Sequence, residues 1–396
     1  MTLNPVEGPD EIVVHAPTEC RGCGAGLDDA PVVSESVRQV FDIPAPAVVV
    51  VEHRAQRRKC SCGCETSAMF PNEATAPTCY GPNVKAYAIY LLVRQHVPQE
   101  RCAEALADMF GTDVSVGTLN NWLTEAAEAL VTFLVAVTAG LRAAPVIGVD
   151  ETSVRSKRTK LWVHVCRTRL LTLLFVHEKG RKLEAIQAGP MTGYTGTAIH
   201  DRYSSYFPFE DCTHALCNAH ITRNLEGISR PKRQQAWTTP MLTLIFDTKT
   251  RVDQIRADGG TGLTPSELAK VPKRWGEIVT EGLTINPEQT GDHKYQPHVD
   301  ARNLALALRD RRDMFLAYTT NPNIDWDNNG AERDFRMIRV QANISGEFRS
   351  LHGAQRFATI RSYTSTTVKH GCSPLKNLAL LFTEHRAWLP PPTALT

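Results

Sequence analysis

The chain has 396 residues, of which 42% are apolar and 22% are charged. This length exceeds that of a usual single domain, so we expect two or three folded units, and the composition excludes a disordered or fibrous chain. The net charge is +2, but acidic and basic residues are separated along the chain. Residues 1–50 carry eight acids and two arginines, whereas residues 330–370 carry seven bases and three acids. Such a separation is compatible with nucleic-acid binding by part of the surface.

Neither a membrane span nor a leader peptide is evident in the sequence. The longest strongly apolar run, residues 129–141, has thirteen residues, and a helix that crosses a bilayer needs about 20. Residues 1–11 contain no Lys or Arg and no apolar core, so they do not resemble a signal peptide. We therefore expect a soluble cytoplasmic protein with no membrane partner.

Residues 1–78 are predicted to form a small zinc-binding β module, in which residues 48–51 are a β-like run. Five of the eleven cysteines of the chain lie there in two clusters: Cys20, Cys23, Cys60, Cys62 and Cys64. Without a leader peptide, clustered cysteines indicate metal binding rather than disulfides. The C-x2-C pair of the first cluster and two cysteines of the second would supply the four thiolates of a structural zinc site. The alternative is a metal-free module with reduced thiols.

Residues 79–143 are predicted to be helical. Pro98 is expected to break the chain, and a helix over residues 99–110 is expected to end at Gly111. Ser115 is a candidate N-cap of a third helix. Helix, short glycine-containing turn and helix resembles a helix-turn-helix DNA reader. The alternative is a plain helical hairpin, which is the commoner structure.

Residues 144–226 are predicted to begin an α/β core, a mixed sheet covered by helices. The expected strands include residues 146–149, 161–167, 171–177, 197–200 and 214–217. Residues 227–322 are interpreted as an insertion, and the stretch 255–300, which is rich in Gly, Thr and Pro, is expected to form long loops between helices. Residues 323–396 are expected to be mainly helical and basic and to complete the core.

Two aspartates are candidates for metal binding because each is expected to end a strand. Asp150 follows residues 146–149, and Asp201 follows residues 197–200. Carboxylates from two neighbouring strand ends can share a divalent cation, which prefers hard oxygen ligands. The alternative for either residue alone is an acid that caps a turn.

Glu332 is the candidate for a third carboxylate, at the start of a predicted helix that Asp327 is expected to cap. The alternative is an exposed acid paired with Arg336 four residues later. Two-metal phosphoryl transfer needs acids to hold the ions and bases to hold the nucleic-acid backbone. Four basic residues that follow are expected to contact DNA phosphates: Arg333, Arg336, Arg339 and Arg349.

Cys217 and His220 form a C-x2-H pair directly after a predicted strand. As zinc ligands they would need two more, for which Cys212 and His214 are the nearest supply. His200 is either a general base or a strand-end histidine with a hydrogen-bond partner.

Four sequence blocks resemble, in order, those of the transposases of insertion-sequence family 66: residues 148–152, 200–203, 217–220 and 327–333. The paired cysteine clusters also resemble that family. The resemblance implies an RNase H-like catalytic core with an Asp-Asp-Glu triad, here Asp150, Asp201 and Glu332, interrupted by an insertion between the last two. Through two Mg²⁺ ions, or Mn²⁺, such a triad would cut and join DNA.

The same resemblance assigns further residues. It implies that Cys217 and His220 pack near the catalytic centre and shape it. Because Cys62 is followed by Gly63, as in the Cys-Gly of the family, Cys60 and Cys62 are the favoured zinc ligands of the second cluster, and Cys64 is the alternative.

The predicted function is that of a DNA transposase of a mobile insertion element. Its partners would be double-stranded DNA, both the ends of the element and the target, with a homo-oligomer on DNA and accessory proteins from the same element as further expectations. The alternatives are another RNase H-like nuclease or integrase, or a catalytically inactive DNA-binding descendant of a transposase. Because all three carboxylates are present, activity is favoured.

Overall fold

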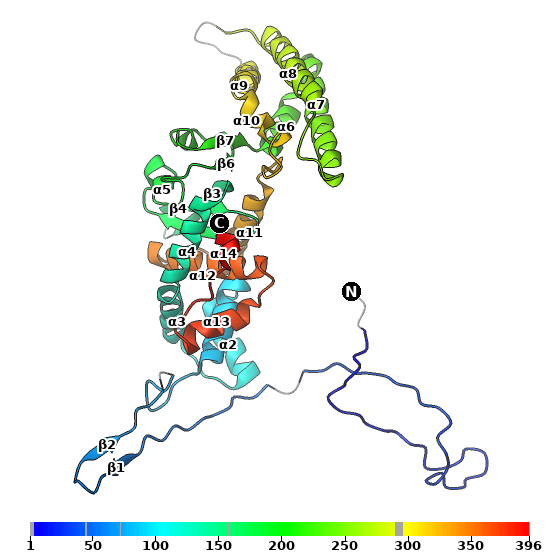
Figure 1. The fold of residues 1–396 in the computed structure, drawn as a ribbon, viewed down its shortest axis with the longest axis vertical. Helices are drawn as coiled ribbons and strands as arrows, with labels where there is room; N and C mark the ends of the chain where they lie inside the picture. Colours follow the sequence, from blue (N-terminus) through cyan, green and yellow to red (C-terminus); the bar gives the residue numbers. More distant parts are fainter. Residues whose placement is uncertain (1–3, 44–45, 72, 157–158, 290–295, 396) are drawn as a thin grey trace.

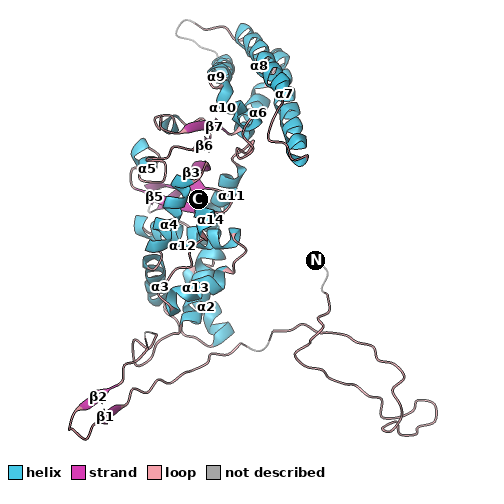
Figure 2. Cartoon of the chain, viewed as in Figure 1, coloured by secondary structure: helices cyan, strands magenta, loops and turns pink. Residues whose placement is uncertain are grey.

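The computed structural model describes residues 4–395, except for 44–45, 72, 157–158 and 290–295. Figure 1 shows a body of helices around a sheet, a helical projection on one side of it, and an extended N-terminal segment. Figure 2 shows that this N-terminal segment is almost entirely loop.

The N-terminal segment contains one small sheet. Strands β1 (Arg57–Lys59) and β2 (Glu65–Ser67) pair antiparallel, with Arg58 opposite Thr66. The β-like run over residues 48–51 is not a strand: these residues are exposed, Val49 by 82%. A run of valines has strand propensity, but among the described residues none pairs with residues 48–51 as a strand.

A set of short helices follows, with the breaks that the sequence predicts. They are α1 (Pro82–Ile89), the π-helix η1 (Tyr90–Arg94), α2 (Gln99–Phe110), α3 (Val116–Glu128) and α4 (Val131–Ala143). Pro98 caps α2, and Gly111 ends it with a φ of 67°. The Ser115 hydroxyl accepts a hydrogen bond from the backbone N–H of Thr118 at the start of α3. Helix α3 packs on α1 and α12, and its exposed residues are Gly117, Asn121 and Glu128.

The core is a five-stranded mixed sheet of order β5-β4-β3-β6-β7. Its strands are β3 (Val146–Ser156), β4 (Thr159–Arg167), β5 (Thr172–His177), β6 (Thr197–His200) and β7 (Thr213–Leu216). Strands β3, β4 and β5 are antiparallel neighbours, whereas β3, β6 and β7 run parallel. The helix α5 (Leu183–Gln187) and the 3-10 turn η2 (Ser204–Tyr206) lie in the connections. The mixed sheet with helices confirms the predicted α/β class.

Strand β3 is longer than the sequence predicts. It continues past Asp150 to Ser156, because β4 pairs with it without interruption from Gly148 to Ser156. Asp150 therefore does not end the strand but lies in its middle. The charged pair Asp150-Glu151 suggested a strand end, yet the Glu151 carboxylate is buried and paired inside the protein.

Residues 218–319 are mainly helical. The elements are α6 (Asn218–Ile228), α7 (Lys232–Ala257), α8 (Pro265–Ile285), α9 (Gln296–Asp310), α10 (Arg312–Leu316) and the 3-10 turn η3 (Ala317–Thr319). Residues 255–300 contain more helix than expected, because α8 and part of α9 lie there; the described connections between the helices are residues 258–264 and 286–289. Pro265 stands at the start of α8, where its missing N–H costs nothing, and Thr264 forms a capping box with Glu267. These helices have a separate apolar core around Trp237 and Trp275.

The C-terminal helices return to the sheet. They are α11 (Asn329–Ser345), α12 (Leu351–Lys369), α13 (Pro374–Thr383) and α14 (Pro392–Leu395). Helix α11 packs on β3, and α12 packs on β5. Two hydroxyls of α12 accept hydrogen bonds from the backbone of β5: Thr366 from the N–H of Thr172 at 3.1 Å, and Ser362 from the N–H of Leu174 at 2.8 Å.

The helices of residues 79–143 are not packed as a separate unit. One apolar cluster runs from Ala86 and Leu119 through Ile147 and Val165 of the sheet to Leu381 of α13. In the described part of the chain, no single helix is both long and apolar enough to span a bilayer; only α3 and α4 taken together, bent by 46°, reach that length and composition.

Candidate active site

Asp150 lies on β3, and Asp201 directly follows the end of β6, its parallel neighbour. The pairing of the two strands ends where Gly148 lies opposite Ile199, two residues before each aspartate. Alternate residues of a strand point to the same face of the sheet, so Asp150 shares the face of Gly148. The Asp150 carboxylate accepts a hydrogen bond from the N–H of Glu151, and that of Asp201 from the N–H of Tyr203, both at 2.8 Å.

Glu332 reaches this face from the first turn of α11, whose start Asn328 ties to the sheet. The Asn328 side-chain amide donates to the carbonyl of Val149 at 2.9 Å, one residue before Asp150. Two glycines permit this approach, because a Cβ at Gly148 would lie 2.5 Å from the Asn328 side chain and a Cβ at Gly330 would lie 1.8 Å from Arg167. The helix is therefore held directly over β3.

The N-terminal cap of α11 differs from the prediction. Asn328, rather than Asp327, occupies the cap position. Asp327 still satisfies the helix start, since its carboxylate accepts hydrogen bonds from the backbone and side-chain amides of Asn329 at 2.8 Å and 2.6 Å.

Cys217 and His220 lie beside the start of α11. The buried Cys217 sulfur accepts a hydrogen bond from the N–H of Asn328 at 3.1 Å, and His220 Nε2 lies 3.6 Å from a Glu332 oxygen. Within the residues that the structure describes, no three or more His, Cys, Asp or Glu side chains are grouped so that they could hold a metal ion. Cys217, His220, Cys212 and His214 accordingly form no zinc cluster.

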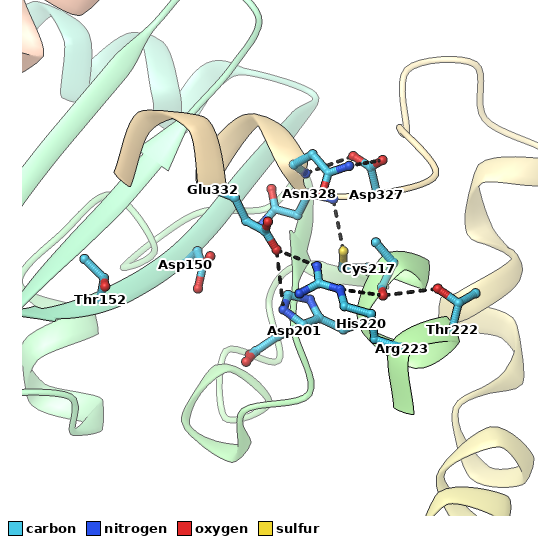
Figure 3. A network of polar contacts seen from close by, with 12 residues as sticks. Asp150, Thr152, Asp201, Cys217, His220, Thr222, Arg223, Asp327, Asn328 and Glu332 are labelled. Atoms are coloured by element: carbon cyan, nitrogen blue, oxygen red, sulfur yellow. Dashed lines mark hydrogen bonds and ion pairs between the residues drawn. The ribbon is translucent and has the colours of Figure 1, made fainter. Parts of the chain in front are cut away.

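Glu332 forms its ion pair across the site rather than along its own helix. Its carboxylate accepts a hydrogen bond from Arg223 of α6 at 2.8 Å. Figure 3 shows Glu332 directed toward Arg223 and His220, with Asp150 on the strand side. The alternative pairing with Arg336 is not found among the described contacts.

Burial, together with the negative charges of Glu151, Asp201 and Glu332, raises the pKa of Asp150 to about 7. Carboxylates in such electrostatic proximity repel one another unless a cation is present. Their oxygens are the donors that Mg²⁺ and Mn²⁺ prefer. The donor chemistry therefore suits a hard divalent cation. Within the described residues, however, the three carboxylates are not grouped closely enough to hold one, and Glu332 is turned to Arg223.

A second charged cluster, which the sequence analysis does not predict, lies on the other face of β3. The Glu151 side chain is fully buried, 2.5 Å from Arg181 Nε, and it accepts a hydrogen bond from the Tyr206 hydroxyl. The Arg181 guanidinium stacks 3.6 Å from the Tyr203 ring centre and lies 4.0 Å from the Asp201 carboxylate. The alternation of side chains along a strand was the available signal, because it sends adjacent acids to opposite faces.

His200 is the strand-end histidine with a hydrogen-bond partner. Its Nε2 lies 2.9 Å from His214 Nδ1, and its Nδ1 bonds to the carbonyl of Asp201. Burial, and then His214, lowers the pKa of His200 to about 3. A neutral, fully hydrogen-bonded imidazole does not favour the alternative of a general base.

The four predicted phosphate-binding arginines are all exposed. Arg339 lies 3.4 Å from the hydroxyl of Thr152, two residues along β3 from Asp150. Together with Arg155 and Lys160 it lines a groove of about 1020 Å³ between β3, β4 and the end of α11. Among the described residues, Arg333, Arg336 and Arg349 have no carboxylate partner.

The predicted zinc cysteines lie in two separate turns. In the first, the N–H of Gly24 donates to the carbonyl of Cys20 at 2.8 Å, and in the second the N–H of Gly63 donates to that of Cys60 at 2.9 Å. Both glycines have positive φ, of 76° and 90°. The turns lie on different extensions of the N-terminal segment (Figure 1) and are not brought together.

The local environment of these thiols fits a metal. Backbone N–H groups of Gly22 and Cys23 lower the pKa of Cys20, and the N–H of Cys62 lowers the pKa of Cys60. The thiolate is the form that ligates zinc. Cys62 thus acts on Cys60 within one turn, while Cys64 shares a backbone hydrogen bond with Cys60 across the β1–β2 turn.

Comparison with known protein families gives two matches. The model of the Transposase IS66 family matches residues 77–356, and that of the zinc-finger binding domain of transposase IS66 matches residues 17–65. No curated protein matches the chain. The first match covers more than half of the sequence, including all three candidate carboxylates, and the second covers both cysteine clusters. The chain belongs to the IS66 family of transposases.

Proposed function

We propose that this transposase cuts and joins DNA strands by metal-dependent phosphoryl transfer, with Asp150, Asp201 and Glu332 holding two Mg²⁺ or Mn²⁺ ions. The observation that carries the proposal is the placement of Asp150 on β3 and of Asp201 directly after its parallel neighbour β6, beneath a helix that Asn328 ties to β3. The raised pKa of Asp150 supports it, because a bound cation would relieve the repulsion. Such ions, when bound, stabilise the attacking and leaving oxygens of an in-line displacement.

The chain's own residues would position the DNA and the carboxylates. The exposed guanidinium groups of Arg333, Arg336, Arg339 and Arg349 would hold backbone phosphates. Cys217 and His220 would shape the site: the first fixes the start of α11, and the second holds the Glu332 carboxylate near Arg223.

We infer the same functional division of the chain that the sequence suggests. An RNase H-like core would comprise residues 144–226 and 323–396, interrupted by the insertion 227–322. Residues 1–78 would form the zinc module and residues 79–143 a DNA-binding segment, although the exposed residues of α3 include no base. The substrate would be double-stranded DNA, at the element ends and at the target, bound by a homo-oligomer with accessory proteins of the element.

The test is strand cleavage and strand transfer on duplex DNA that carries the ends of the element, in Mg²⁺. Replacing Asp150, Asp201 or Glu332 by Ala should lower both reactions by about 10³-fold or more, and the double replacements should lose little beyond the singles. DNA binding should persist. The matched control is Asp211→Ala, an exposed carboxylate on the loop before β7, which should keep its activity.

Three outcomes would contradict parts of this proposal. An Asp150→Ala protein that still cuts DNA would show that the assignment of the catalytic carboxylates is wrong. A wild-type protein that cuts but never joins DNA would be an RNase H-like nuclease, and one that binds DNA without cutting would be an inactive DNA-binding descendant.

A further inference from the structure

A cleft of about 780 Å³ opens beside the carboxylates, between the core and the helical insertion. Its core wall consists of Arg202, which directly follows Asp201, and of one side of α6. The start of α7 forms its base, and residues of α9 form the opposite wall. The charged side chains that line it are Arg202, Arg223, Arg230, Arg233 and Asp300.

The cleft carries a marked excess of positive charge, since four arginines face a single acid. Within the described residues, neither Arg202 nor Arg230 makes a hydrogen bond or an ion pair, although the charge of the adjacent Asp201 attracts Arg202. Arg202 is half-buried and Arg230 is exposed. Arg233 donates only to the backbone carbonyl of Ile285. Guanidinium groups without carboxylates on a concave surface attract anions and favour phosphate, which they bind with two parallel hydrogen bonds.

The position of the cleft identifies the anion. Arg202 adjoins Asp201, and Arg223 contacts Glu332 (Figure 3), so an anion held there lies next to the proposed reaction site. From Arg223 to the end of α6 at Ile228 the helix rises by about 7.5 Å, which exceeds the rise of about 3.4 Å per nucleotide measured along the axis of duplex DNA. The cleft is thus long enough for more than one phosphate of a continuous strand.

We propose that this cleft holds the backbone phosphates of DNA that flank the reacting bond, so that the insertion 227–322 serves as a DNA clamp. The proposal rests on the proposed function and adds a second DNA contact, distinct from the arginines of α11. It places Arg230 and Arg233 as DNA-binding residues, and the binding is independent of base sequence because only phosphates are contacted.

The experiment measures the affinity of the full-length protein for a fluorescent DNA duplex of arbitrary sequence at several salt concentrations. Arg230→Glu should weaken binding by about tenfold and lower the log–log salt slope by about one unit, as expected for one lost phosphate contact. Arg230→Glu combined with Arg233→Glu should weaken it further. Because Arg230 has no described intramolecular partner, its variant should keep the wild-type thermal unfolding curve.

Arg274→Glu is the matched control. Arg274 is an exposed arginine on α8 of the same insertion, outside the cleft, where it pairs with Glu277 at 3.0 Å. The same charge reversal changes the net charge by the same two units, and at this position it should leave the affinity within about twofold of wild type.

The outcomes separate the clamp from the proposed function. If Arg230→Glu binds DNA like wild type while Arg336→Ala and Arg339→Ala bind it more weakly, the clamp is wrong and the transposase function stands. If inorganic phosphate or ATP raises the melting temperature of wild type but not of Arg230→Glu, and DNA affinity is unchanged, the cleft binds a small anion instead. If the wild-type protein does not bind DNA at all, both proposals fail.

Discussion

Asp150 and Glu151 are adjacent in sequence, yet their side chains lie on opposite faces of β3 because side chains alternate along a strand. Asp150 faces α11 and the proposed ions. Glu151 holds Arg181, which in turn lies between the Tyr203 ring and Asp201. Through Arg181, Glu151 therefore positions the loop that carries Asp201.

Glu151→Gln should consequently lower the stability of the protein. It leaves the Arg181 guanidinium without its buried carboxylate, and we expect the free energy of unfolding to fall by about 1.5–3 kcal/mol. Urea denaturation measures this change. In the background of Arg181→Met the same replacement should cost much less, since the two residues are coupled. Equal losses in both backgrounds would show that the pair does not act as a unit.

The pairing of Glu332 with Arg223 affects metal binding. Arg223→Gln removes the positive partner, so Glu332 should become available to a cation, and Mn²⁺ affinity without DNA should rise by about two- to fivefold, the equivalent of a partly exposed ion pair. Isothermal titration calorimetry measures this Mn²⁺ affinity. Arg274→Gln serves as the control, and unchanged or weaker Mn²⁺ binding by Arg223→Gln would contradict the interpretation.

Local sequence signals predicted the ends of the helices correctly. Pro98, Gly111 and Ser115 marked helix ends because each acts through its own backbone conformation or side-chain hydrogen bond. The stretch 255–300 contains more helix than its glycines and prolines predict. Pro265 instead starts α8, a position at which proline is favoured.

The candidate site was predictable in part. Asp201 could be found from its place after an apolar strand, and Glu332 from its place at a helix start. The length of β3 could not be found, because it depends on pairing with β4, a tertiary contact. The same holds for Arg223 and Arg181, whose roles arise from partners 109 and 30 residues away in sequence.

The seating of α11 on the sheet gives a prediction for Gly330. A Cβ there would lie 1.8 Å from Arg167 Nη1, and Arg167 is not free to move because Asp334 pairs with it at 3.3 Å. Gly330→Ala should therefore lower the free energy of unfolding by about 1–3 kcal/mol and displace Glu332. Gly276→Ala is the control: a Cβ in this glycine of α8 meets nothing within 4 Å, and the change should stabilise by about 0.5–1 kcal/mol. Equal effects would contradict the steric account.

Asp334 also links α11 to α12 through Lys369, at 3.3 Å. Burial lowers the pKa of Lys369 to about 8, against the opposing attraction of Asp334. Between pH 8 and the ordinary pKa of about 10.5, the unfolded chain binds more protons than the folded one, so this residue makes stability rise with pH. The stability of wild type relative to Lys369→Met should increase over that window in urea titrations. A flat or falling difference would contradict the assignment.

For the whole molecule, the cysteine module should fold independently of the rest. No residue before Ala86 belongs to the buried apolar core of the described chain, so residues 4–78 depend on metal for their order. We expect about one equivalent of zinc in reduced, chelator-free protein. Strong chelators should make this segment sensitive to protease while the body keeps its melting temperature. Substantially less than one equivalent of zinc would contradict the prediction.

Helix α12 has a consequence for self-association. Exposed outer strands of sheets invite pairing with a second chain, and β5 is an outer strand of this one. The hydroxyls of Ser362 and Thr366 occupy the outward N–H groups of β5 as a sixth strand would. Two copies of the transposase therefore cannot join into a continuous sheet through β5, because α12 already takes the place that a strand of the second copy would need.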